Sequence, residues 1–104
     1  MEQVILCQGA VGVAIYSDCH RAELSISQQD ELRFPLTAQN LAQILAGETI
    51  QFSHKGIFCK LTRYGDKISI VFAWRGVHDS AECDAMLLEN VYWRIQANDA
   101  TVVN

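Results

Sequence analysis

Histidine and cysteine, the side chains most often found in catalytic pairs and metal sites, occur three and four times in the sequence. The residues in question are His20, His54 and His78, with Cys7, Cys19, Cys59 and Cys83. Each histidine lies in or beside a predicted turn, and no two cysteines have the Cys-x-x-Cys spacing of a zinc knuckle or redox motif. The spacing therefore predicts neither a metal site nor a cofactor. We interpret Cys7 and Cys59, which lie in apolar strand patterns, as buried thiols.

A thiol and an imidazole come close in sequence at three places. Cys19 precedes His20 directly, but adjacent residues of a strand point to opposite faces and cannot form a catalytic pair. Two further pairs share one separation, namely His54 with Cys59 and His78 with Cys83. Each of these pairs spans a turn and a strand or helix, unlike the compact knuckle of a structural zinc site. We identify no catalytic residue, and a metal- or thiol-dependent enzyme is only the third hypothesis.

Positive charge is concentrated between residues 55 and 75. The five cations there are Lys55, Lys60, Arg63, Lys67 and Arg75, against the single acid Asp66. A strand predicted over residues 57–64 places Phe58, Lys60 and Tyr64 on the face opposite its aliphatic residues. The next strand would add Arg75 to the same surface. These four residues, Phe58, Lys60, Tyr64 and Arg75, are the predicted binding site.

Two functions suit a sheet face that mixes aromatic and cationic side chains. Interfaces between proteins are enriched in aromatic residues and arginine. Sheet-based binders of single-stranded nucleic acid also stack bases on aromatics between cations. The net charge of −4 and the pI near 5.2 disfavour binding to phosphate backbones. A third interpretation places Phe58 and Tyr64 in the core, covered by other elements.

The composition favours a non-catalytic protein–protein interaction module, either a homodimer or a small acidic binding or inhibitor protein. Single-stranded nucleic-acid binding through the 55–75 segment is the alternative. No apolar run reaches the ~20 residues that cross a bilayer. Glu2 also stands where a signal peptide would carry positive charge. We therefore expect a cytoplasmic protein without a membrane partner.

The first half of the chain predicts strands followed by a helix. Alternating apolar residues indicate strands over residues 11–16 and 22–27, and the apolar run at residues 4–7 is expected to be a strand that Gly9 ends. A fourth repeat over residues 32–36 contains Pro35, which restricts it to the edge of a sheet. Thr37 is the expected N-cap of a helix with Leu41 and Ile44 on its apolar side, and Gly47 is its expected end.

The second half predicts the same order of elements. Strands are expected over residues 49–53, 57–64 and 68–74, joined by short turns. After Gly76, Asp79 and Glu82 have the spacing of a capping box and indicate a helix. A strand remains the alternative over residues 80–96, because Val91 and Ile95 fit both periods. Residues 97–104 are expected to fray.

These elements predict one α+β domain that covers residues 1–104. An antiparallel sheet of about six to seven strands, with two helices packed on one face, is the expected architecture. The strand-then-helix order in both halves hints at an internal duplication, although the residues themselves match poorly.

Overall fold

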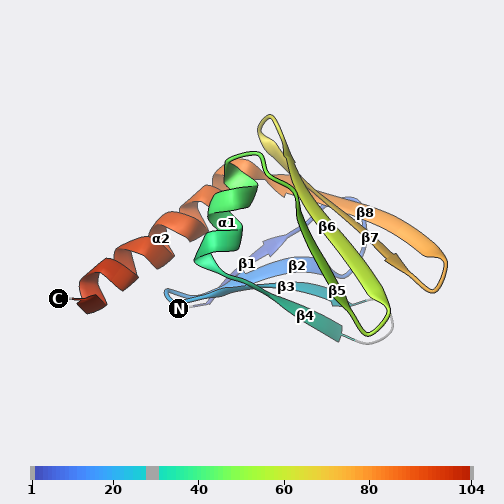
Figure 1. Ribbon diagram of the computed structural model, residues 1–104, viewed down its shortest axis with the longest axis horizontal. Coiled ribbons are helices and arrows are strands. Elements are labelled where there is room, and N and C mark those ends of the chain that lie inside the picture. The colour runs from blue at the N-terminus through green and yellow to red at the C-terminus, as the bar shows by residue number, and fades with distance from the viewer. Residues whose placement is uncertain (1, 28–30, 104) are drawn as a thin grey trace.

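The computed structural model describes residues 2–27 and 31–103, and the side chains of these residues as far as Asn98. Its elements follow one another as four strands and a helix, twice (Figure 1). The first group is β1 (Gln3–Leu6), β2 (Val13–Ser17), β3 (Ala22–Ser27), β4 (Glu31–Leu36) and α1 (Ala38–Leu45). The second group is β5 (Ile50–His54), β6 (Ile57–Tyr64), β7 (Lys67–Trp74), β8 (Val77–Asp84) and α2 (Ala85–Val103).

The strands form two antiparallel sheets of four strands each, which we call sheet A (β1-β2-β3-β4) and sheet B (β5-β6-β7-β8). The predicted α+β class is confirmed. The predicted single sheet of six to seven strands is wrong, because the described residues form eight strands in two sheets. The two helices pack against each other and supply buried residues to the core that both sheets share.

The core lies between the inner faces of the two sheets, with the helices at one end (Figure 1). Alternation in each strand turns one set of side chains inward, such as Ile15 and Leu24 of sheet A and Leu61 and Ile70 of sheet B. The sheets also meet along their edges. Phe34 of β4 stacks on Phe52 of β5 with ring centroids 5.6 Å apart. Backbone hydrogen bonds between Gln8 and Glu82 join the other pair of edges.

Helix α1 begins and ends where the sequence predicts. The Thr37 hydroxyl accepts a hydrogen bond from the Asn40 backbone N–H at 3.0 Å, and the Asn40 side-chain oxygen Oδ1 accepts one from the Thr37 N–H at 3.1 Å. This reciprocal pair satisfies two of the amides that a helix N-terminus leaves without partners. Leu41 and Ile44 are fully buried, and Gly47 follows the helix with φ +96°.

The second helix begins later than predicted. Residues 77–84 form β8, which pairs with β7 from Val77 opposite Trp74 to Asp84 opposite Lys67. Asp79 therefore caps no helix, and its carboxylate instead accepts a hydrogen bond from the Ser80 N–H. The Arg75-Gly76 turn explains the difference, because a two-residue hairpin turn sends the chain straight back along β7.

Beyond Ala85 the helical prediction is confirmed, since the chain is helical to Val103. Leu88, Val91 and Ile95 are buried at helical spacing, so the strand alternative is wrong for this part. The structure describes side chains only as far as Asn98, so it does not test the expected fraying of residues 97–104, which stays a prediction. Over the residues described, neither helix has the length and apolar character needed to cross a bilayer.

Candidate functional site

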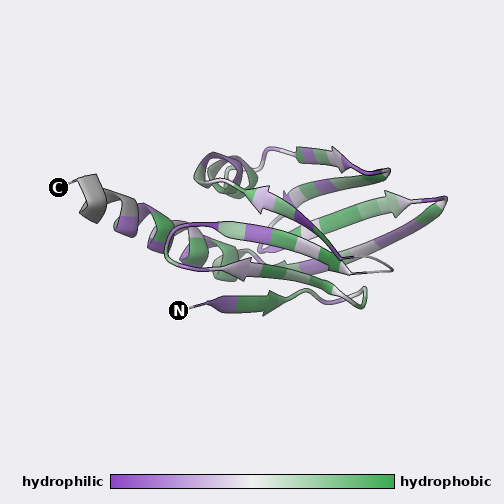
Figure 2. Cartoon of the chain, turned by 90° about the horizontal axis from the view of Figure 1, so that it is seen from below, coloured by the Kyte–Doolittle hydropathy of each residue, from purple (hydrophilic) through white to green (hydrophobic). Residues whose placement is uncertain are grey.

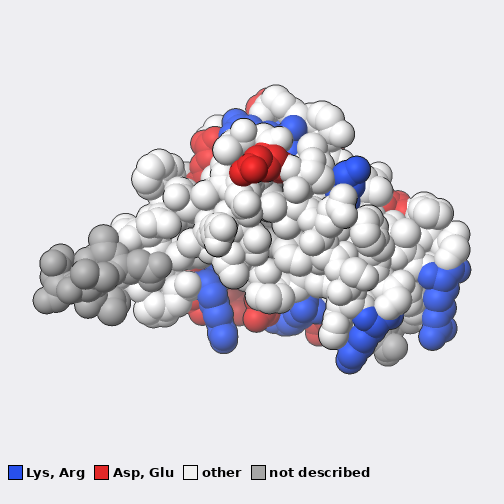
Figure 3. Space-filling model, viewed as in Figure 1, with Lys and Arg blue, Asp and Glu red and all other residues white. Residues whose placement is uncertain are grey.

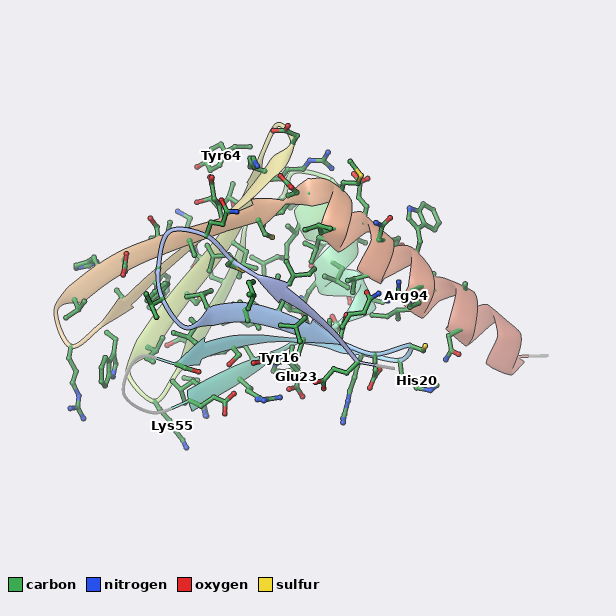
Figure 4. The ribbon with its side chains drawn as sticks, turned by 180° about the vertical axis from the view of Figure 1, so that it is seen from behind. Tyr16, His20, Glu23, Lys55, Tyr64 and Arg94 are labelled. Atoms are coloured by element: carbon green, nitrogen blue, oxygen red, sulfur yellow. The ribbon has the colours of Figure 1, made fainter. Side chains whose placement is uncertain are left out.

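The outer face of sheet B displays the aromatic residues that the sequence places there. Phe58 is 44% exposed and Tyr64 is 67% exposed, whereas Cys59 and Leu61 on the other face of β6 are fully buried. Tyr64 projects away from the body of the protein near the end of β6 (Figure 4). The interpretation that these aromatics belong to the core is therefore wrong.

Strand register shows what surrounds these residues. Phe58 lies opposite Ala73, and Lys60 lies opposite Val71, which is 45% exposed. Cross-strand neighbours on one face contact each other, so Phe58, Ala73 and Val71 form an apolar strip with Lys60 beside it. Tyr64 lies further along β6, opposite Lys67.

Two of the five cations in this segment are neutralised within the protein. Arg63 lies 3.3 Å from the Glu89 carboxylate and donates a hydrogen bond to the Leu45 carbonyl oxygen. Lys67 forms an ion pair with Asp84 at 2.5 Å, and that carboxylate raises the pKa of Lys67. The basic character predicted for the whole segment is therefore reduced to the other three cations.

Among the described residues, no acidic side chain pairs with Lys55, Lys60 or Arg75. Lys55 and Arg75 occupy the two hairpin turns at one end of sheet B, where positive charges project from the surface (Figure 3). Arg75 does not lie on the strand face as predicted. It sits in the β7–β8 turn, and its guanidinium group stacks over Trp74 at 4.9 Å from the ring centroid.

The outer face of sheet A is occupied by its own charge network. Arg33 pairs with Glu23 at 3.2 Å and with Glu31 at 3.0 Å, and its guanidinium lies over the Tyr16 ring. Tyr16 and Glu23 lie side by side on this face (Figure 4). Because its charges are satisfied internally, we do not regard this face as a candidate site.

A second uncovered surface runs along β1, the edge strand of sheet A. The Cys7 N–H donates a hydrogen bond to the Val13 carbonyl oxygen of the neighbouring chain segment. Successive residues of a strand point their N–H and C=O groups to alternate sides, so Val4 and Leu6 direct theirs away from β2. Gln8 has the same phase as Val4 and Leu6, and it pairs on that side with Glu82 of β8. No strand within the described residues pairs with Val4 or Leu6 there.

The chain after β8 turns into α2 and leaves a groove beside this edge. The groove has a volume of about 520 Å³ and is lined by residues 3–6 and Leu87, all uncharged. Figure 2 shows β1 as an outlying strand that is hydrophobic along most of its length. We call this surface the β1–α2 seam and define it by its exposed apolar residues, which are Val4, Leu6 and Leu87.

The sequence carried a signal for the seam that its periodicity obscured. Residues Val4 to Cys7 are all apolar. A strand with one face in solvent normally alternates apolar and polar residues, so this run has more apolar side chains than one buried face requires. Leu6 is 77% exposed and Val4 is 47% exposed, so the apolar residues of this edge are not all used by the core.

The histidines are spread over separate surfaces. His20 Nδ1 lies 2.7 Å from Asn98 Nδ2, and the ring of His54 meets Phe34 edge-on. No cluster of three or more histidine, cysteine or acidic side chains with metal-binding geometry occurs among the described residues.

Three of the four cysteines are buried, as expected for Cys7 and Cys59. Burial raises the pKa of the Cys59 thiol to about 12, which keeps it protonated and unreactive. Cys7 and Cys83 form a pair that the sequence did not indicate, because they are distant in the chain. The Cys7 thiol donates a hydrogen bond to the Cys83 sulfur, which raises the pKa of Cys7 and lowers that of Cys83.

Two uncovered surfaces and one thiol pair are therefore the features of this fold that could carry a function. No protein-family model, no curated protein and no solved structure matches the chain.

Proposed function

We propose that this protein is a cytoplasmic, non-catalytic protein–protein interaction module that works as a homodimer. The observation that supports this most strongly is the β1–α2 seam, where an unpaired strand edge lies next to exposed apolar side chains. Natural proteins usually protect an edge strand with charges, proline or a bulge. In this chain β4 carries Pro35 and β8 carries Asp79 and Glu82, whereas β1 carries no such residue.

A second copy of the chain is the partner that fits this edge. If β1 pairs with its own copy in antiparallel orientation, the outward amide and carbonyl groups of Val4 form hydrogen bonds with the copy, while Gln8 stays paired with Glu82. The exposed side chains of Val4 and Leu6 then lie at the contact between the two copies.

Charge and area support the same partner. Two copies of a chain with net charge −4 repel each other, which favours a contact without charged side chains. Residues 3–6 meet this condition, because none of them is charged. A short strand pair is much smaller than the ~800 Å² that each partner buries in a stable interface. Leu87 on α2, which lines the same groove as β1, supplies further apolar surface.

The test introduces a charge into the seam. Leu6→Glu is tolerated by the monomer because the side chain is 77% exposed, but it places an unpaired carboxylate inside each half of the dimer. We expect the dimer to dissociate at least about 100-fold more readily, measured by sedimentation equilibrium. Val77→Glu is the matched control, since Val77 is 59% exposed at the far hairpin. A Leu6→Glu protein that dimerises like the wild type would rule out the seam.

The outer face of sheet B is the second surface of the proposed module, and it receives a different protein partner. Phe58, Lys60 and Tyr64 lie on this face, and Arg75 lies at its end. The unpaired cations favour a partner segment that combines acidic and apolar side chains. Phe58→Glu distinguishes the two surfaces, because we expect this variant to remain a dimer. Loss of the dimer in Phe58→Glu alone would move the self-association to sheet B.

Single-stranded nucleic-acid binding is the alternative function, and the unpaired cations Lys55, Lys60 and Arg75 favour it. They accompany the exposed Phe58 and Tyr64 rings, which offer stacking surfaces. Against it stand the internal neutralisation of Arg63 and Lys67 and the acidic net charge.

Salt dependence tests this alternative. If the hairpin end of sheet B binds single-stranded nucleic acid, its affinity for a fluorescent oligonucleotide falls as the salt concentration rises. The slope of log K against log salt concentration then reports how many phosphates the protein neutralises. Three cations predict a slope near −2 for a single strand, on the basis of ~0.7 per contact. Absence of binding at low salt excludes the alternative and leaves the homodimer proposal unaffected.

A further inference from the structure

Two backbone hydrogen bonds fix the register between the edges of sheets A and B. The Gln8 N–H donates to the Glu82 carbonyl oxygen at 2.8 Å, and the Glu82 N–H donates to the Gln8 carbonyl oxygen at 2.7 Å. This exchange makes Gln8 and Glu82 a hydrogen-bonded antiparallel pair. Cys7 and Cys83 are the next residues along each chain, so they face each other in the following, non-hydrogen-bonded position.

That position suits a disulfide. Cα atoms of non-hydrogen-bonded antiparallel pairs lie about 4.5 Å apart. Disulfides join Cα atoms separated by roughly 4.4–6.8 Å. The contact between the two sulfurs agrees with this geometry, because the Cys7 thiol donates a hydrogen bond to Cys83. Both thiols are free in the structure.

Cys7 and Cys83 are slightly exposed, by 8% and 6%, whereas Cys59 is fully buried. Cys83 borders a surface groove of about 50 Å³ that also contains Leu6 and Lys67. Cys59 does not border this groove.

We propose that Cys7 and Cys83 form a reversible oxidation site, at which a peroxide converts the two facing thiols into a cross-strand disulfide. The Cys83 thiolate attacks one peroxide oxygen, the O–O bond breaks, and a sulfenic acid and one water result. The Cys7 sulfur then attacks the sulfenic sulfur, the S–O bond breaks, and a second water leaves. Two thiols are oxidised and one hydrogen peroxide is reduced to two waters. A thiol reductant reverses the reaction by exchange.

The order of attack follows from the local charges. The hydrogen bond from Cys7 lowers the pKa of Cys83 most, and the Lys67 ammonium lowers it further. Burial and the carboxylates of Asp84 and Glu82 oppose this effect. Cys7 donates the bond and has its own pKa raised, so Cys83 is the first nucleophile and Cys7 the resolving thiol.

The disulfide would join the end of β1 to β8 and close a loop that contains most of the chain. Long closed loops restrict the unfolded chain most, so oxidation is expected to raise the melting temperature. The site is independent of the homodimer, because both sulfurs belong to one chain.

The experiment uses hydrogen peroxide on the folded protein with Cys19→Ser, which removes the half-buried thiol able to join two chains. After quenching, the remaining thiols are alkylated in denaturant, and the intact mass and peptide map are measured. We expect a loss of two hydrogens, one Cys7–Cys83 bond, an alkylated Cys59, and full reversal by dithiothreitol. The oxidised protein should melt several degrees higher than the reduced one.

Two variants of the same background serve as controls. Cys59→Ala should form the disulfide as before, whereas Cys83→Ala should lose it and leave Cys7 open to alkylation. The proposal is overturned if Cys7 and Cys83 both remain alkylatable after oxidation, if the disulfide involves Cys59, or if Cys83 overoxidises without bonding to Cys7. The main readout is made with both cysteines present, so poor folding of a variant does not affect it.

Discussion

Cys59 shows how burial alone determines the behaviour of a reactive side chain. It lies on the inner face of β6, where it is fully buried, and burial raises its pKa from 9.0 to about 12. A pKa raised on folding means that the folded state holds its proton where the unfolded state releases it. The stabilising contribution is therefore complete below pH 9 and is lost as the pH rises from about 9 towards 12.

A comparison of the wild type with Cys59→Ala tests this. At pH 8 the variant is less stable, because it leaves a small cavity in the core. Between pH 8 and 10 the advantage of the wild type should shrink by about 1.4 kcal/mol, because the unfolded thiol loses its proton over this range and the folded one keeps it. Guanidinium unfolding at pH 8, 9 and 10 measures the difference. A constant difference across this range would contradict the assigned pKa.

Lys55 and Arg75 occupy backbone conformations that their residue types disfavour. Each is the first residue of a two-residue hairpin turn, with φ of +51° and +48°, and each is followed by a glycine with positive φ. Turns of this kind prefer asparagine, aspartate or glycine. Because these residue types fit the turns poorly, we infer that Lys55 and Arg75 are present for their positive charge and not for the stability of the turns.

Asparagine substitutions at these two positions separate the cost of the left-handed backbone from the gain of the side-chain contacts. Lys55→Asn should raise the free energy of unfolding by about 0.5–1 kcal/mol, because it relieves a left-handed lysine. Arg75→Asn should change it by close to zero, since the variant also loses the stacking of Arg75 on Trp74, worth about 0.5–1 kcal/mol. Urea unfolding of both variants checks the difference. Equal gains would show that the Arg75–Trp74 contact does not contribute.

At the scale of single elements, local signals predicted most of the fold. Thr37, Leu41 and Gly47 located α1, since capping and apolar spacing act within the helix itself. Pro35 placed β4 at the edge of a sheet, as it is in the structure. Such features depend on neighbours in sequence, and therefore the sequence reveals them.

Strand β8 is the element where local signals misled. Asp79 and Glu82 have the spacing of a helix start, yet the pairing of residues 77–84 with β7 outweighs this weak preference. Ala81 and Cys83 are the buried residues of β8, and their alternation is short enough to escape notice. The decisive interaction is tertiary, and no local pattern contains it.

The candidate sites divide in the same way. The exposure of Phe58, Lys60 and Tyr64 followed from alternation within one strand, and the structure agrees. The thiol pair could not be predicted, because it requires the bridge between Gln8 and Glu82, which joins opposite ends of the chain. Arg75 was misplaced because alternation does not continue through a turn.

The whole molecule repeats one order of elements, but its two halves are covered unequally. Helix α1 is short and packs against β4, β5 and β6, so the first strand of the second half is covered. Helix α2 is longer, packs against β8 and α1, and extends away from the body (Figure 1). The first strand of the first half, β1, therefore keeps an open edge.

This inequality leads to the central claim, which is that two copies cover each other's open β1 edges. The direct measurement is native mass spectrometry of the reduced wild-type protein, supported by sedimentation equilibrium over a range of concentrations. The account predicts a dimer of twice 11.6 kDa that Leu6→Glu dissociates and Val77→Glu does not. A wild-type protein that remains a monomer up to about 100 μM, far above the Kd of a stable interface, would contradict it.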